Sequence, residues 1–274
     1  MTHHYHVPSF PLNRFITGFT YYKGYVANHT IDRFLPNGNV EIIINLTAEP
    51  KYIYDNETLT ESQQFKKLWI SGIRNKFISI PSGTGAEMFI IEFKKGMVHS
   101  FLGRPLTEIA GRVVEGEFIL AGVFLELRER LLETLPGIPM FTLAEAMLNK
   151  KFYSKLTVNP FIDFAVTSII SNPAGITIKN IADKVGYSSK HLINIFSNHV
   201  GVNPKAFLRI IRFQKAVQEI ETNGNINWIQ LAHDCGYYDQ AHLIVNFKEF
   251  SGFTPLEYVQ AKGTDPWLNY VPVG

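Results

Sequence analysis

The sequence predicts an α+β multidomain protein with an N-terminal β-barrel or β-sandwich, a helical linker, and an all-α C-terminal domain with two helix-turn-helix units. Two observations support this fold class. Short segments rich in β-branched residues alternate with Gly, Pro and Asn turns in the first hundred residues, and a helical pattern with an internal repeat follows. The predicted domains are residues 1–112 for the β domain, 113–157 for the linker, 158–263 for the helical domain and 264–274 for a C-terminal tail.

The first domain contains short segments that favour strands because they alternate or carry β-branched residues between turns. The segments are 39–46, 51–55, two strands within 67–81, and 86–93. Several short strands of this kind are typical of a sandwich or barrel. Before them, His3, His4 and His6 are expected to lie in a frayed terminus rather than to bind a metal.

From about Met97 the pattern becomes helical. Apolar residues between Leu120 and Leu135 recur every three or four positions, which predicts an amphipathic helix that ends at Pro136-Gly137. A second helix is expected over 143–152. These helices pack against the protein's own domains or form a dimer seam; an apolar stripe favours the first without excluding the second.

The C-terminal region contains an internal repeat. IADKVGY (181–187) recurs as LAHDCGY (231–237), and HLINIFSNHVGVNP (191–204) recurs as HLIVNFKEFSGFTP (242–255), with nine identical positions. Each copy has the pattern of a helix, a Gly-centred turn, a second helix and a Pro-started helix, which predicts a helix-turn-helix unit. Gly186 and Gly236 are expected to adopt a positive φ in the two turns.

Helix boundaries in this region are marked by capping residues. Thr177, Ser188, Asn203 and Asp239 are predicted N-caps, and Thr254-Pro255-Leu256-Glu257 is a predicted capping box. The helix that starts at Pro204 is predicted to end at Asn223-Gly224, which gives it a length of about 30 Å. Since major-groove faces on one side of B-DNA are about 34 Å apart, this connector would place both second helices in adjacent grooves.

The second helix of each unit has an inward and an outward face. Leu192, Phe196, Leu243 and Phe247 have the spacing of a core face, so the residues that contact bases must lie on the other face. The predicted base-reading residues are Lys190, His191, Asn194, Gln240, Ala241, His242 and Val245. The predicted phosphate contacts are Ser188, Arg209, Arg212, Lys215 and Lys248.

These residues resemble the AraC/XylS family of bacterial transcription regulators. The resemblance covers about Pro160 to Lys262, and its most specific parts are GYYDQAHLIVNFKEFSGFTPLEY (236–258) and SSKHLINIF (188–196). It implies a sequence-specific regulator that binds double-stranded DNA and has a cupin-like N-terminal sensory domain for a small-molecule effector. It also implies a homodimer, and RNA polymerase as a further partner.

The chain departs from this family at two positions. Second helices in the family often carry an arginine two residues before the shared phenylalanine, where this chain has Asn194 and Val245. Asparagine can bind adenine, whereas valine can contact only a thymine methyl group. Residues 158–263 contain nine Lys and Arg against eight Asp and Glu, a net charge of +1, so phosphate attraction is modest. We therefore expect the first unit to dominate base reading, the second mainly to anchor, and dimerisation to be needed.

Other functions are less well supported by the sequence. His29 and His99 are isolated, and neither a phosphate loop nor a nucleophile triad is visible, so we expect no catalytic activity and no cofactor. Cys235, the single cysteine, occupies an apolar helix position and is expected to be buried. The alternative function is a protein-interaction module whose degenerate helix-turn-helix units no longer bind DNA, motivated by Ile193, Ile244 and Val245.

The sequence indicates a location but no ligand residue. Without a signal-peptide pattern or an apolar run long enough to span a bilayer, a cytoplasmic protein is expected. Tyr25, Trp69, Arg74 and Phe89 are residue types that line pockets, but buried aromatic residues usually belong to a core, so the sequence assigns no ligand residue.

Overall fold

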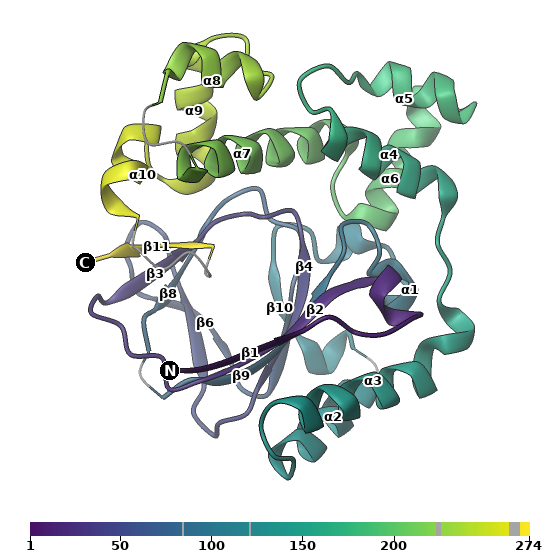
Figure 1. Ribbon diagram of the computed structural model, residues 1–274, viewed down its shortest axis with the longest axis vertical. Coiled ribbons are helices and arrows are strands. Elements are labelled where there is room, and N and C mark those ends of the chain that lie inside the picture. The colour runs from purple at the N-terminus through teal and green to yellow at the C-terminus, as the bar shows by residue number, and fades with distance from the viewer. Residues whose placement is uncertain (84, 121, 223–225, 263–268) are drawn as a thin grey trace.

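The computed structural model describes residues 1–83, 85–120, 122–222, 226–262 and 269–274. Figure 1 shows a β domain with a helical domain lying along one side of it. A long helix, α7 (Pro204–Thr222), crosses this side, and the two helix-turn-helix units lie at its opposite ends.

The N-terminal domain is built on a six-stranded antiparallel sheet in which β9 and β4 are central. Its strand order is β1-β2-β9-β4-β7-β10. Ile42 of β4 lies opposite Ile91 of β9 and Ile70 of β7, so apolar residues form a continuous strip across the centre of the sheet. The strands are β1 (Thr2–His6), β2 (Ile16–Lys23), β4 (Val40–Asn45), β7 (Leu68–Ser71), β9 (Glu87–Phe93) and β10 (Val113–Glu115).

A five-stranded antiparallel sheet lies across from it, with the order β11-β3-β8-β5-β6. Within the described ranges, the recorded strand pairings do not join the two sheets into a closed barrel. The domain is therefore a sandwich of two sheets, one of the two architectures that the sequence predicts. The strands are β3 (Ile31–Phe34), β5 (Lys51–Tyr54), β6 (Glu61–Phe65), β8 (Ile78–Pro81) and β11 (Tyr270–Val273).

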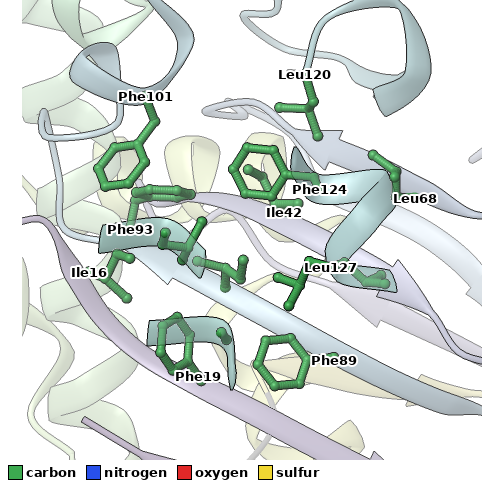
Figure 2. Packing of buried hydrophobic residues seen from close by; sticks show 14 of the residues in the cluster. Ile16, Phe19, Ile42, Leu68, Phe89, Phe93, Phe101, Leu120, Phe124 and Leu127 are labelled. Atoms are coloured by element: carbon green, nitrogen blue, oxygen red, sulfur yellow. The ribbon is translucent and has the colours of Figure 1, made fainter. Parts of the chain in front are cut away.

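Helices α2 (Val123–Leu132) and α3 (Ile138–Phe152) cover the outer face of the six-stranded sheet. Phe124 and Leu127 of α2 are fully buried there against Ile42 and Phe89 of the sheet (Figure 2). Because side chains alternate along a strand, the neighbours of Ile42 in β4 point to the other face, between the two sheets. Short helices connect these elements: η1 (Leu12–Arg14), α1 (His99–Leu102), η2 (Leu106–Glu108), η3 (Gly116–Phe118) and η4 (Tyr153–Lys155).

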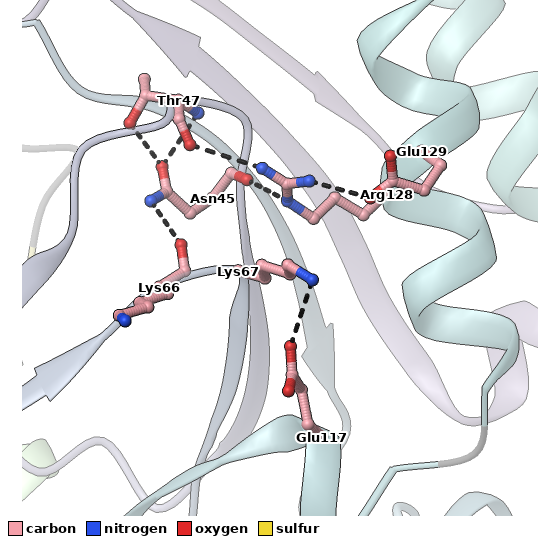
Figure 3. A network of polar contacts seen from close by, with 7 residues as sticks. All are labelled: Asn45, Thr47, Lys66, Lys67, Glu117, Arg128 and Glu129. Carbon is pink, nitrogen blue, oxygen red and sulfur yellow. Dashed lines mark hydrogen bonds and ion pairs between the residues drawn. The ribbon is translucent and has the colours of Figure 1, made fainter.

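A buried arginine fixes α2 against the sheet (Figure 3). Arg128 Nε donates to the carbonyl oxygen of Asn45 at 2.8 Å, and its Nη1 lies 2.9 Å from Glu129 Oε1. Asn45 in turn donates through Nδ2 to the carbonyl oxygen of Lys66 at 2.8 Å. The bond from Arg128 Nε satisfies the backbone carbonyl at the end of β4, where the sheet ladder stops, and the bond from Asn45 satisfies that of Lys66 between β6 and β7.

The prediction of a frayed N-terminus is wrong. Residues 2–6 form β1, which pairs with β2 along its length. His6 stacks on Phe141 of α3 with 5.2 Å between ring centroids, and its Nε2 lies 2.6 Å from Glu145 Oε1. The strand is stabilised by its ladder and by α3, and neither partner is adjacent in the sequence.

The predicted linker helices differ from the structure in their extent. The first helix spans ten residues rather than the region from Leu120 to Leu135, and Leu135 is 76% exposed. The second begins earlier than predicted, at Ile138, with Pro139 in its first turn. The expectation of helix from Met97 onward is wrong at Val113–Glu115, which pairs with β7 as β10. The domain boundaries themselves remain a prediction.

The C-terminal domain is helical within its described residues, and its core includes residues from the β domain. Leu35, Ile73 and Val271 of the sandwich belong to the same buried cluster as Phe196 and Phe207. Within the described ranges, none of the helices combines the length and apolarity that crossing a bilayer requires. Besides α7, the helices are α4 (Pro160–Ser171), α5 (Ile178–Val185), α6 (Ser189–Val200), α8 (Trp228–Asp234), α9 (Gln240–Ser251) and α10 (Pro255–Ala261).

Candidate nucleic-acid interface

The first helix-turn-helix unit consists of α5 and α6. Thr177 Oγ1 accepts from the backbone N–H of Asn180 at 3.1 Å, and Ser188 Oγ accepts from that of His191 at 3.2 Å, so both predicted caps are confirmed. Gly186 in the turn has φ +71°, as predicted, which is a region that favours glycine. The cap at Ser188 fixes where α6 begins and therefore which residues face outward.

The second unit consists of α8 and α9 and repeats this geometry. Asp239 Oδ1 accepts from the backbone N–H of His242 at 2.7 Å, and Gly236 in the turn has φ +82°. A β-carbon at Gly236 would lie 2.7 Å from Ala174 Cα, so close packing also requires glycine here. The capping box of α10 is present in full, with Glu257 and Thr254 bonded reciprocally.

The outward faces of α6 and α9 carry the residues that the sequence predicts to contact bases. Leu192, Phe196, Leu243 and Phe247 are all fully buried, which orients both helices as predicted. The opposite faces are exposed to solvent, and Val245 is 65% exposed. The predicted base-reading residues Lys190, His191, Asn194, Gln240, Ala241, His242 and Val245 are all exposed.

Two histidines on these faces have defined environments. His191 packs its ring edge-to-face with Tyr187, with 4.6 Å between centroids. His242 Nδ1 accepts a hydrogen bond from the backbone N–H of Tyr238 at 3.4 Å. A neutral imidazole that accepts through Nδ1 carries its proton on Nε2, so His242 offers a donor to a partner outside the protein.

The basic residues of α7 make bonds within the helical domain. Arg209 donates to Asn246 Oδ1 at 2.9 Å and to Glu249 Oε2 at 2.6 Å, which ties α7 to α9. Arg212 Nε donates to the carbonyl oxygen of Pro173 at 2.8 Å. These side chains and Lys215, whose Nζ donates to the carbonyl oxygen of Asp234 at 2.6 Å, stabilise the placement of the helices around α7. Their contact with phosphates stays a prediction.

The two remaining predicted phosphate contacts differ from each other. Lys248 on α9 and Ser188 are both exposed, but Ser188 uses its hydroxyl as the cap of α6.

Cys235 is fully buried, and burial raises the pKa of its thiol to about 12, in agreement with its predicted place in the core.

Helices α6 and α9, the second helices of the two units and the candidate recognition helices, both end against the β sandwich. A β-carbon at Gly201, which follows α6, would lie 2.8 Å from Ile73. A β-carbon at Gly252, which follows α9, would lie 2.8 Å from the ring of Phe77. The helices therefore run in the same general sense, from their capped N-termini toward the sandwich (Figure 1). Their exposed N-terminal halves lie on the side away from it.

The sandwich contains a cavity of about 190 Å³ between the two sheets. Tyr25, Trp69 and Arg74 line it, whereas Phe89 lies in the core on the other face of the sheet. Sequence patterns could not bring these residues together with Glu41 and Tyr270, because the five lie on different strands and loops. Only the alternation along β4, where Glu41 and Ile43 occupy the same face, gives a local signal.

Comparisons with known proteins agree with this architecture. Residues 181–261 match the model of a family described as "Helix-turn-helix domain", and residues 4–115 match "Domain of unknown function (DUF6597)". The chain is 30% identical over 101 residues to an AraC-like transcription regulator of Streptomyces lividans, which is 36% of this chain and 33% of that protein. It is 28% identical over 81 residues to an HTH-type transcriptional regulator of Haemophilus influenzae, or 30% of this chain and 27% of the relative.

The chain thus matches about a third or less of the length of these relatives. Among solved structures, ToxT from Vibrio cholerae is similar over 88% of this chain and 98% of that one, with 12% identity and a TM-score of 0.48. The fold defines a protein with two helix-turn-helix units on one connecting helix. The C-terminal domain is a helix-turn-helix domain of the AraC type.

Proposed function

We propose that this protein is a sequence-specific transcription regulator that inserts α6 and α9 into successive major grooves of double-stranded DNA. The observation that carries the proposal is the exposure of seven side chains on matched faces of two similarly directed helices, while the opposite faces are fully buried. A side chain that serves only the fold gains nothing from such a placement, whereas one that contacts bases requires it.

The two units differ in what they offer to DNA. Asn194 can make paired hydrogen bonds to adenine, and Lys190 can donate to guanine. On α9, Gln240 and His242 are polar, but Val245 occupies the position that matches Asn194. We infer that the first unit supplies most of the discrimination between sequences and the second mainly fixes the register.

The test uses a DNA site selected from random sequence with the full chain, followed by footprinting and gel shift with point variants. Asn194→Ala should weaken binding by about fivefold to hundredfold, because one bidentate base contact is worth about 1–3 kcal/mol. Val245→Ala should weaken it by less than about threefold, since only an apolar contact with a thymine methyl is at stake. Asn180→Ala, at an exposed asparagine of α5, is the matched control and should leave affinity unchanged. A larger loss from Val245→Ala would contradict this assignment.

The alternative is a protein-interaction module, and exposed apolar residues on the recognition helices favour it. Ile193 is 42% exposed and Val245 is 65% exposed. The same gel shift separates the two functions, because a regulator binds duplex DNA with an affinity that falls as salt increases. Absence of salt-dependent binding at low ionic strength would favour the module.

The N-terminal domain is proposed to bind a small effector and to support a homodimer, which would compensate for the low net charge of the helical domain. We propose RNA polymerase as a further partner. The cavity between the two sheets supports the effector part of this proposal.

A further inference from the structure

The cavity between the two sheets has the size and lining of a binding site for one small ring. Aromatic and aliphatic side chains from both sheets form most of its wall, among them Tyr22, Phe34, Trp69 and Ile80. A cavity of about 150 Å³ with apolar walls accommodates benzene. At about 190 Å³, this cavity therefore has room for a single aromatic ring with a small substituent.

Arg74 is one of the polar residues that line the cavity. Arg74 is only 7% exposed and donates through Nη1 to the carbonyl oxygen of Phe34 at 3.1 Å and through Nη2 to that of Leu35 at 3.5 Å. A guanidinium has five N–H donors, so these two bonds leave donors for a further acceptor. Burial lowers the pKa of Arg74, and the negative charge of Glu41 acts in the opposite direction.

The charges around the cavity balance one another. Its lining contains two cations, Arg74 and Lys51, and two carboxylates, Glu41 and Asp32. Asp32 Oδ1 lies 2.5 Å from His29 Nε2 and accepts a hydrogen bond from it; a neutral imidazole leaves the negative charge of Asp32 in this balance. An anionic ligand would add a charge that this set does not compensate, and removing such a charge from water is costly. The lining thus favours an uncharged polar group that can both donate and accept hydrogen bonds.

Part of the cavity wall comes from the C-terminal end of the chain. β11 follows the second helix-turn-helix unit in sequence, yet it pairs with β3 of the sandwich, with Tyr270 opposite Phe34. The hydroxyl oxygens of Tyr270 and Tyr25 are 2.7 Å apart, and Tyr270 lines the cavity. The next residue, Val271, is fully buried in the core that the helical domain shares with the sandwich.

We propose that this cavity binds a compact, uncharged aromatic molecule, and that β11 is a structural part of the site. A ligand that contacts Tyr270 stabilises the paired form of β11 by the free energy of that contact. Because β11 belongs to the segment after α10, binding strengthens the attachment of the second helix-turn-helix unit to the N-terminal domain. An effect of this attachment on DNA binding rests on the proposed function, whereas the binding of the ligand does not.

The first experiment measures binding of benzamide, benzoate and cyclohexanecarboxamide to the full chain, by saturation-transfer NMR and calorimetry without DNA. Benzamide should bind, and the other two should bind at least about tenfold more weakly, since benzoate adds a charge and the saturated ring loses contacts with aromatic walls. Binding of none of the three, or tighter binding of benzoate, would overturn the assigned ligand class.

Substitutions at Tyr270 test the role of β11. Tyr270→Ala should weaken benzamide binding by at least about tenfold, because it removes one aromatic wall. Tyr270→Phe keeps the ring and should bind with nearly the affinity of the natural chain, which guards against misfolding as the cause. Tyr153→Ala, at a tyrosine that is 66% exposed in η4, is the control. Equal affinity of the Tyr270→Ala variant would exclude β11 from the site.

Hydrogen exchange tests the coupling. Benzamide should slow amide exchange of residues 271 and 273 in β11, because opening of the strand then requires loss of the ligand contact. Benzamide binding with unchanged exchange in β11 would refute the coupling. Gel shifts on the same preparations distinguish the two proposals: DNA binding with no binding of any ring compound refutes this inference alone, and the reverse result refutes the regulator.

Discussion

His99 and His199 form a stacked pair where the two domains meet. Their ring centroids are 4.1 Å apart with an interplanar angle of 20°, and His199 Nδ1 donates to the carbonyl oxygen of Ile195 at 2.9 Å. Asp163 and Tyr187 line the same surface depression. Burial, followed by the neighbouring charge of His199, lowers the pKa of His99. The folded protein therefore resists a proton that the unfolded chain accepts.

This pair predicts a loss of stability in mild acid. As pH falls through the ordinary histidine pKa of about 6.5, the unfolded state takes up a proton that folded His99 does not, so the free energy of unfolding decreases. His99→Gln should reduce this decrease, measured as the change in thermal midpoint between about pH 7.5 and about pH 5.5. His233→Gln, at an exposed histidine of α8, is the control. Parallel pH profiles for the natural chain and His99→Gln would contradict the prediction.

At the scale of single residues, the sequence predicts local contacts well and distant ones poorly. The caps at Thr177, Ser188 and Asp239 are confirmed, because a capping side chain bonds to a backbone group two or three residues away. Arg209 could not be placed from the sequence, since its partners Asn246 and Glu249 lie 37 and 40 residues away. A surface basic residue and a structural one have the same appearance in a helical pattern.

Among the elements, α5 and α6 are each followed by a glycine in a left-handed conformation, and the two glycines serve different purposes. Gly186 has φ +71°, and a β-carbon there would meet nothing within 4 Å. Gly201 has φ +100°, and a β-carbon there would also approach Ile73 and the carbonyl oxygen of Leu106. The first glycine is needed for the turn, and the second is also needed for contact between α6 and the sandwich.

Alanine substitutions at these positions should separate the two effects. Gly186→Ala should lower the free energy of unfolding by about 1–2 kcal/mol, the cost of a left-handed conformation for a residue with a β-carbon. Gly201→Ala should cost more, because it adds a steric clash with a neighbouring element. Urea unfolding of the two variants provides the measurement. Equal losses would show that α6 and the sandwich adjust without strain.

Prediction of elements succeeded where the pattern is periodic and failed where tertiary contacts decide. The helix-turn-helix units have buried positions every three or four residues, and their bounds follow from caps and turn glycines. β6 (ESQQF) has four exposed polar residues out of five, so nothing in its own sequence indicates a strand. It is stabilised by pairing with β5, just as β1 is stabilised by β2 and α3.

At the scale of the whole molecule, the β sandwich and the helical domain share packing. The guanidinium carbon of Arg33 lies 4.3 Å from the ring centroid of Phe77 and 4.8 Å from that of Phe253, so an arginine of β3 links the residue before β8 to the segment between α9 and α10. Gln214 of α7 donates through Nε2 to the carbonyl oxygen of Pro36 at 2.6 Å. These contacts, together with α7 between the two units, restrain α6 and α9, the recognition helices, relative to the β sandwich.

A restrained pair of recognition helices predicts a strict dependence on the spacing of the two half-sites. The 19 residues of α7 span about 28 Å, which is close to but shorter than the roughly 34 Å of one duplex turn. Inserting five base pairs between the half-sites rotates the second groove to the far side of the duplex. Inserting ten restores the face but adds about 34 Å, which α7 cannot span.

Both insertions should therefore reduce the affinity of the full chain to that of its first unit alone, as measured by gel shift on the selected site. The double variant Gln240→Ala/His242→Ala supplies the matched control, because a protein that has lost base contacts from α9 should bind all three spacings equally. If the natural chain also bound all three equally, the second unit would not enter a groove. If affinity returned with ten inserted base pairs, α7 would not act as a rigid connector, and the two units would bind as independently mobile domains.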